Sequence, residues 1–492
     1  MKTTKNVISN FFGQLYVASL GFIFLPFYLK SLGPEAFSLI GIYSLLQAWL
    51  HLLDGGLTAT LGRESAKYLG GGHTHLSFRL LIRSIEYISI ILSILMIIIL
   101  AFGSNYVANN WLNPENLESN IIQKCLFIIA LIIALRFIEG LYKSFLNGIQ
   151  KQFLLNVINS INGTFRWVGA AILLKIGFNN PLSFFSWQLL SSLISTFTFG
   201  LASYKLLPKV PKKSLRFSSK SLFLIKEFAF GMIFINVLAL VIGQTDKIIL
   251  SRVLTLKSFG FYTLAASIAG FSFFLSSPIT NAFYPLLCKY KQENDLELLI
   301  KTFHKSAKTI SIFLGSTSIY FILFCKPILD IWISDTFIVS QITLLVQLLI
   351  FGNFLNTLMW IPYHTQLAYG WTSLTIKINL ILCCIIVPST YYVSITYGSI
   401  GVPFIWIFVN SIYLLFSINI MFQKILKTKK LKWLIDDTLK PLIYILVITL
   451  IFRFLYPINT SLFLKVLYIA TTSITVLLSS LKVFKLKNLE II

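Results

Sequence analysis

The chain has 492 residues, of which 56% are hydrophobic and 12% are charged. Soluble globular domains carry about 25% charged residues, so this composition excludes a water-soluble globule, a disordered chain and a secreted disulfide scaffold. The 41 Lys and Arg exceed the 17 Asp and Glu and give a net charge of +24. In so apolar a chain, the first explanation to test for this excess is the positive-inside rule, which places Lys and Arg in cytoplasmic loops.

Fourteen apolar runs of helix length follow one another along the sequence. They are rich in Ile, Leu and Phe without strand-like alternation, so membrane helices fit and a membrane β-barrel does not. The first run lacks a small-residue cleavage site and is expected to be the first membrane helix. The prediction is an all-α polytopic membrane protein with about 14 transmembrane helices. The runs lie near residues 8–29, 36–56, 84–103, 122–145, 153–175, 182–205, 228–251, 259–286, 307–328, 341–363, 373–393, 400–422, 438–455 and 461–481.

The positive charges predict the orientation of these helices. With the N-terminus in the cytoplasm, the inside segments hold 29 Lys and Arg and the outside segments hold 8. This asymmetry predicts that both termini are cytoplasmic. The basic runs 209–220 and 424–432 are explained by topology and by contact with anionic lipid headgroups, so no nucleic-acid partner is expected.

A short internal match indicates two parallel halves. Residues 32–40 and 254–262 match at an offset of 222, and each stretch joins an outward-going helix to an inward-going one. We therefore expect two six-helix lobes followed by two additional helices. Parallel duplicated halves are typical of transporters, with the site between the halves. The expected boundaries are 1–222, 223–430 and 431–492.

Four short motifs stand in order on the first seven predicted helices. They are LGPEAF at 32–37, DGGL at 54–57, GIQ at 148–150 followed by Asn156 and Arg166, and QTDK at 244–247. Together they resemble motifs of the polysaccharide-unit flippases, the Wzx-like members of the MOP exporter superfamily. That superfamily also contains the MATE drug exporters and the lipid II flippases. One departure is Ser38, where the family usually has Gly, and Ser is also small.

The resemblance implies a multi-pass transporter of the bacterial inner membrane. Such flippases move an undecaprenyl-pyrophosphate-linked oligosaccharide from the cytoplasmic to the outer leaflet for O-antigen, capsule or exopolysaccharide assembly. The resemblance implies a drive by an H+ or Na+ gradient rather than by ATP, and neither a catalytic residue nor a cofactor. Membrane lipids are expected partners, as are the polymerase and chain-length proteins of the same pathway.

Four cationic residues lie inside the apolar runs: Arg136, Arg166, Lys247 and Lys377. A charge at the bilayer centre costs about 2.5–3.5 kcal/mol on insertion scales, so such residues usually face a cavity or a partner. Lys247 and Lys377 lie near span ends, where a long stem reaches the interface. We expect the four to line a cationic central cavity for a pyrophosphate, with Arg136 and Arg166 deepest, because guanidinium groups bind phosphate oxygens in a fork.

Polar residues recur on one face of several apolar helices. Stripes of this kind are expected to line a water-filled cavity, although they also fit a simple role in joining helices. The expected cavity-lining residues are Asn10, Gln14, Gln47, His51, Asn156 and Asn159. The candidates for ion coupling are the carboxylates Asp54, Glu139 and Asp246.

Purely structural roles also stay open for several of these residues. Arg136 and Glu139 have the spacing of an ion pair within one helix, and Arg166 can pair with a carboxylate or with helix-end carbonyls. Asp54 can cap the end of its helix beside Gly55 and Gly56. The five cysteines have no metal-ligand spacing, so no metal site is expected.

Three other functions fit parts of the pattern. A MATE-like drug exporter would share the fold, but its cationic substrates call for acidic cavity residues. A lipid II flippase of peptidoglycan synthesis fits both the basic cavity and the fourteen helices. A membrane-bound glycan polymerase would need a large outer loop, and the longest stretches outside the membrane are only about 25 to 30 residues.

Overall fold

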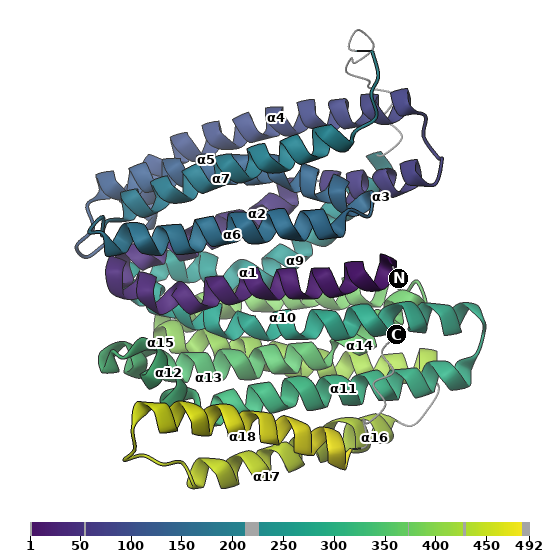
Figure 1. Cartoon of the computed structure of the whole chain (residues 1–492). Coiled ribbons are helices and arrows are strands. Elements are labelled where there is room, and N and C mark those ends of the chain that lie inside the picture. Colours follow the sequence, from purple (N-terminus) through teal and green to yellow (C-terminus); the bar gives the residue numbers. More distant parts are fainter. Residues whose placement is uncertain (1, 54–55, 212–225, 372, 427–429, 485–492) are drawn as a thin grey trace. The chain divides into compact units, whose positions relative to one another are not determined.

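The structure is a computed structural model that describes residues 2–53, 56–211, 226–371, 373–426 and 430–484. The described residues form helices joined by turns and contain no strand, only an isolated bridge between Asn113 and Thr255. The predicted all-α class is confirmed. The chain divides into two compact units, Met1–Gly260 and Phe261–Ile492. In each unit the long helices run side by side (Figure 1).

The first unit is built around α5, which packs against α4, α7 and α3. α1 packs along α6, and α9 packs against α2. The helices are α1 (Lys2–Leu32), α2 (Pro34–Leu53), α3 (Leu57–Leu69), α4 (His75–Tyr106), the π-helical turn η1 (Val107–Trp111), α5 (Ser119–Gly148), α6 (Gln152–Lys175), α7 (Pro181–Leu206) and α9 (Lys226–Val253).

The second unit is built around α11, which packs against α13, α17 and α18, while α13 packs against α15. Its first helix, α10 (Leu256–Gln292), begins at the end of the first unit. The others are α11 (Leu296–Leu323), α12 (Cys325–Ile333), α13 (Thr336–Leu358), α14 (Trp360–Ala368), α15 (Ser373–Met421), η3 (Phe422–Leu426), α16 (Lys430–Lys432), η4 (Trp433–Leu439), α17 (Lys440–Phe454) and α18 (Leu462–Val483).

Within the described residues, the predicted apolar runs coincide with helical structure, and two of them are interrupted by a helix break. One break separates α11 from α12, and the other separates α13 from α14. In both places the first helix ends four residues before a proline: Leu323 precedes Pro327, and Leu358 precedes Pro362. A proline has no N–H to bond the carbonyl four residues earlier, so the helix breaks there.

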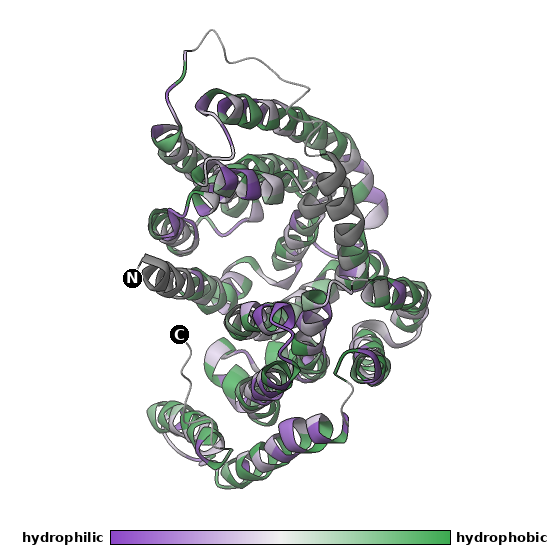
Figure 2. Cartoon of the chain, turned by 90° about the vertical axis from the view of Figure 1, so that its right-hand side faces the viewer, coloured by the Kyte–Doolittle hydropathy of each residue, from purple (hydrophilic) through white to green (hydrophobic). Residues whose placement is uncertain are grey.

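The helices have the composition of a multi-pass membrane protein. Seven stretches of the described residues are long and apolar enough to cross a membrane, and hydrophobic residues colour most helices in Figure 2. α15 holds two predicted runs, which are separated at Gly398 by a backbone conformation (φ 61°, ψ −146°) that is essentially restricted to glycine. The count of fourteen spans and the lobe boundaries 1–222, 223–430 and 431–492 stay predictions.

The LGPEAF motif forms a tight junction between α1 and α2. Gly33 has a φ of +81°, and Pro34 begins α2, where its missing N–H costs nothing. The buried Glu35 carboxylate accepts hydrogen bonds from three consecutive backbone N–H groups of residues 115–117, at 2.7 to 3.2 Å. A side chain at Gly260 would overlap the Pro34 carbonyl oxygen, so the second matching stretch also needs its small residue.

The short helix α3 is held in place by a buried carboxylate. Glu64 bonds Lys67 at 2.9 Å and His73 at 2.8 Å, and Arg63 pairs with it at 2.8 Å. Burial alone would raise the pKa of Glu64. Hydrogen bonds from Lys67 and His73 outweigh burial and hold this pKa below its usual range, with a further contribution from Arg63.

Candidate functional site

Three cationic side chains meet on two apolar helices of the first unit, two of them well inside a helix and the third near a helix end. Arg136 and Lys143 lie on α5, and Arg166 lies on α6. The charges of all three interact electrostatically with one another. We call Arg136, Glu139, Lys143 and Arg166 the cation cluster. In Figure 1, α5, α6 and α7, which supply its residues and partners, run alongside one another.

Lys143 is the best-paired member of the cation cluster. Its Nζ lies 2.5 Å from Glu139 Oε1 and donates to Asn159 Oδ1 at 3.0 Å. The ammonium also lies 4.8 Å from the centre of the buried Phe199 ring. The Glu139 side chain is only 8% exposed, whereas that of Lys143 is 34% exposed. Lys143 is therefore the more accessible member of this pair, and it lies five residues before the end of α5.

Arg166 has neutral partners. Its Nε donates to Gln188 Oε1 on α7 at 2.6 Å, and its guanidinium lies 4.6 Å from the centre of the Trp167 ring. The Trp167 carbonyl in turn accepts a hydrogen bond from Tyr28 at 2.5 Å. No carboxylate hydrogen-bonds Arg166 among the described residues, although Glu139 acts on its charge.

Arg136 has a hydrogen-bond donor that the fold does not use. Its Nε is buried and has no hydrogen-bond partner among the described residues. Its guanidinium lies 5.8 Å from the centre of the Tyr43 ring on α2, yet the residue as a whole is only half-buried. An arginine that is partly accessible but not fully satisfied is suited to an anionic ligand.

The cation cluster has an excess of two positive charges. Within the described part of the unit, three cations act on one another and a single carboxylate, Glu139, acts on all of them. Charges of one sign inside a membrane are costly unless a ligand or counter-ion compensates them. The arrangement is therefore complementary to a ligand with about two negative charges.

The remaining predicted site residues lie on several helices of the two units. In the first unit, Lys247 donates to Gln244 on its own helix at 3.3 Å, Gln14 is exposed, and Gln47 and Asp246 are half-buried. Asn156 is buried and packs against Gly13. Lys377 is exposed on α15 in the second unit.

Three predicted residues lie partly or wholly outside the part of the chain that the structure describes. The side chains of Asn10 and His51 and the whole of Asp54 lie outside the described residues. Among the described residues, no group of three or more His, Cys, Asp or Glu side chains lies close enough to hold a metal ion.

Sequence reasoning missed Gln188 and Glu86. Each is a polar residue inside an apolar run, which is the signal that could have identified it. The buried Glu86 accepts hydrogen bonds from Tyr204 at 2.8 Å and Tyr142 at 3.2 Å, and pairs with Arg83 at 3.3 Å. The hydrogen bonds of Glu86 join α4, α5 and α7, and Arg83 already compensates its negative charge.

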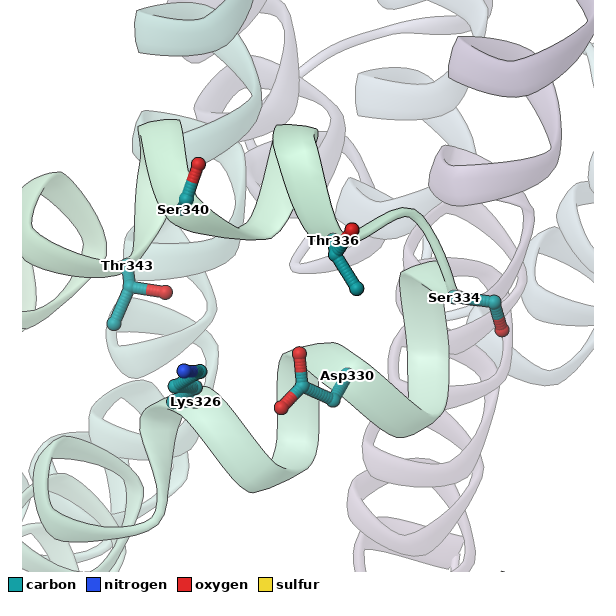
Figure 3. A pocket seen from close by; sticks show the side chains of 6 residues that line it. All are labelled: Lys326, Asp330, Ser334, Thr336, Ser340 and Thr343. Carbon is teal, nitrogen blue, oxygen red and sulfur yellow. The ribbon is translucent and has the colours of Figure 1, made fainter.

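The second unit has a polar pocket of about 440 Å³ between α12 and α13. Its wall residues are Lys326, Asp330, Ser334, Thr336, Ser340 and Thr343 (Figure 3). Most of them are exposed. Because most of its wall residues are exposed, the pocket is open rather than buried.

Sequence comparison identifies relatives in polysaccharide synthesis. The profile of a family described as "Polysaccharide biosynthesis protein" matches residues 3–291. A protein of Shigella flexneri named "Putative O-antigen transporter" is 23% identical over 415 residues, which cover 82% of this chain and 94% of that protein.

Solved structures share the fold. The lipid II flippase MurJ, in an inward closed conformation, superposes with a TM-score of 0.69 at 15% identity, covering 98% of both chains. An inward-facing MATE-family multidrug transporter of the MOP superfamily superposes with a TM-score of 0.68 at 14% identity, covering 84% of this chain and 95% of that one. The MATE/MOP-like architecture expected from the sequence is confirmed.

Proposed function

Because the chain belongs to the polysaccharide biosynthesis protein family, we propose that it is a flippase for an undecaprenyl-pyrophosphate-linked oligosaccharide. It is a multi-pass membrane protein and a transporter rather than an enzyme, like its named relatives. It moves the oligosaccharide from the cytoplasmic to the outer leaflet of the bacterial inner membrane, for O-antigen, capsule or exopolysaccharide assembly. Both termini are cytoplasmic, and an H+ or Na+ gradient supplies the energy.

The observation that carries this proposal is the excess positive charge of the cation cluster. A pyrophosphate diester has about two negative charges, which match the excess of two. Arg136 and Arg166 offer planar forks of N–H donors to its oxygens. The polyprenyl tail stays in the bilayer while the diphosphate and its sugars pass the cluster, in alternating access of the two units.

The sign of the charge separates this function from the export of cationic drugs. A cation entering the cation cluster would be repelled by two uncompensated charges at low dielectric. Lipid II also has a diphosphate, so the cluster does not discriminate against it. The family match to polysaccharide biosynthesis favours the oligosaccharide of a surface polymer.

The test is polymer export in cells that lack the native gene. We expect Arg136→Gln and Arg166→Gln to abolish surface polymer, with lipid-linked intermediates accumulating on the cytoplasmic side and the protein remaining in the membrane. The matched control is Lys175→Gln, because Lys175 is an exposed cation at the end of the same helix as Arg166. Export at the control level by both arginine variants would refute the proposal.

A further inference from the structure

A group of aromatic rings surrounds a histidine in the second unit. The ring of His364 on α14 lies 5.3 Å from Tyr284, 5.6 Å from Tyr363 and 6.5 Å from Trp360, centre to centre. The Trp360 ring is stacked on Phe273 at 6.1 Å. We call Phe273, Tyr284, Trp360, Tyr363 and His364 the aromatic cage. All five are half-buried.

One side of the aromatic cage is fixed by the fold. Trp360 packs against a core that includes the fully buried Phe303 and Met421. Its indole N–H donates to Asn356 Oδ1 at 3.3 Å, and Asn356 donates to Asn410 on α15 at 2.7 Å. This chain of amides holds the indole plane in one orientation, which reduces the cost of ordering it around a ligand.

His364 gives the aromatic cage a polar group that the fold does not use. Its Nδ1 lies 2.7 Å from the Trp360 carbonyl oxygen. A carbonyl only accepts, so Nδ1 donates, and Nε2 is the acceptor of the neutral ring. Among the described residues, Nε2 has no hydrogen-bond partner. The cage therefore combines aromatic rings with one acceptor that no described residue uses.

The helix break at Pro362 places these rings. Because α13 stops at Leu358, Trp360, Tyr363 and His364 stand on the separate short helix α14. Interrupted membrane helices commonly form substrate sites, since irregular backbone is tolerated where it lines a cavity.

Lysines follow the aromatic rings toward the end of the unit that the charge distribution assigns to the cytoplasm. Lys291 lies 5.1 Å from the centre of the Tyr369 ring, and Lys424 lies 5.2 Å from that of Trp371. The positive charges of these two lysines would attract an anionic headgroup and repel a cation.

We propose that the aromatic cage binds a sugar ring of the transported oligosaccharide. A pyranose has an apolar C–H face that stacks on an aromatic ring and hydroxyl groups at its edge that need hydrogen-bond partners. The cage supplies both, through the Trp360 and Tyr284 rings and through His364 Nε2. Sites of this kind combine aromatic walls with a few polar groups. The proposal rests on the proposed function, and it adds a sugar subsite in the second unit to the diphosphate subsite in the first.

The experiment measures two ligands on the full chain in detergent. The probes are the repeat-unit oligosaccharide released from the surface polymer of the source bacterium, observed by saturation-transfer NMR, and inorganic pyrophosphate, measured by calorimetry. We expect Trp360→Leu and Tyr284→Leu to weaken oligosaccharide binding about tenfold, a change of about 1.4 kcal/mol, while pyrophosphate binding is unchanged. Trp360→Phe keeps the ring face but loses the bond to Asn356, and should bind nearly as well as the wild type.

The matched control is Tyr392→Leu, because Tyr392 is a 68% exposed aromatic residue of the same unit. Unchanged oligosaccharide binding by both leucine variants would overturn the proposal that the aromatic cage binds a sugar ring. Preferential binding of tetramethylammonium would also overturn it, since aromatic cages can bind quaternary amines. If the wild-type chain binds neither oligosaccharide nor pyrophosphate, the proposed function fails as well. The Arg166→Gln variant separates the diphosphate subsite from the sugar subsite, because it should lose pyrophosphate binding and retain oligosaccharide binding.

Discussion

Single residues set the charge balance of the cation cluster, and Glu139 supplies the negative charge in it. Glu139 is the one carboxylate that acts on the three cations within the described part of the unit. Its removal and the removal of an arginine change the charge of the cluster in opposite directions. The cluster can therefore be tested by the direction in which a substitution changes pyrophosphate affinity, as well as by loss of function.

We expect Glu139→Gln to bind pyrophosphate about tenfold more tightly than the wild type and Arg136→Gln to bind it more weakly. A unit charge several Å away in a partly hydrated site contributes about 1–3 kcal/mol. Glu139→Gln should also lower the free energy of unfolding by about 1 kcal/mol, because the partly exposed Lys143 loses its partner. Calorimetry and thermal unfolding measure the two effects. Equal or weaker binding by Glu139→Gln would contradict the electrostatic account.

Glu64 predicts a pH dependence of stability. Its pKa is lowered in the folded state, so it stabilises the fold at pH values above its ordinary pKa, and this contribution is lost as the pH falls through the lowered value. Glu64→Gln should therefore be less stable than the wild type at pH 7, and the difference should shrink below about pH 4.5. Thermal unfolding across this range measures the difference. A gap that widens in acid would show that the sign is wrong.

The sequence identifies the deep charges but not their partners. Arg136, Arg166, Glu139 and Asn159 are recognisable as polar residues in apolar runs, and the structure brings them to one place. The bond from Arg166 to Gln188 depends on how α6 and α7 are rotated against each other, which the sequence pattern does not specify. The same holds for the rings around His364, which come from two helices and depend on a break in one of them.

At the scale of helices, small residues allow α3 to pack on α5. A side chain at Gly148 would overlap the Gly62 carbonyl oxygen and lie 2.6 Å from Ser65 Cβ. Such contacts force the backbone apart and typically cost about 1–3 kcal/mol.

We expect Gly148→Ala to lower the free energy of unfolding by that amount. Gly140→Ala is the matched control on the same helix, because its added Cβ would meet only Thr58 Cγ2, at 3.4 Å. The control should be neutral or slightly stabilising, since Ala favours helix over Gly. Similar stability of the two variants, measured by thermal unfolding, would rule out a close crossing of α3 and α5.

Helix positions were largely predictable from the sequence, because a long apolar run in a membrane chain has few alternatives to a helix. The breaks before Pro327 and Pro362 were missed, although proline was visible in both runs. Hydropathy alone does not distinguish a tolerated proline, such as Pro26 inside α1, from one that ends a helix. The difference depends on whether neighbouring groups satisfy the freed carbonyl.

At the scale of the whole chain, the topology is the most direct prediction. The asymmetry of Lys and Arg predicts that both termini and the turn at Asn294 are cytoplasmic, and that the turns at Asn180 and Thr460 are outside. Alkaline phosphatase fused at Asn180 or Thr460 should be active, and green fluorescent protein fused at Asn294 or at the C-terminus should fluoresce. An active phosphatase at the C-terminus would mean an odd number of spans and would rule out fourteen.

The attachment of α3 limits how the first unit can open. Tyr68 on α3 stacks on Phe78 of α4 at 4.3 Å, and its hydroxyl bonds His75 at 2.8 Å. On the other side, Ser144 of α5 donates to the Thr58 carbonyl at 2.5 Å. These contacts join α3 to both α4 and α5, so we expect the three helices to move together when the transporter changes state. A conformational change that separates α4 from α5 would have to break these contacts in every transport cycle.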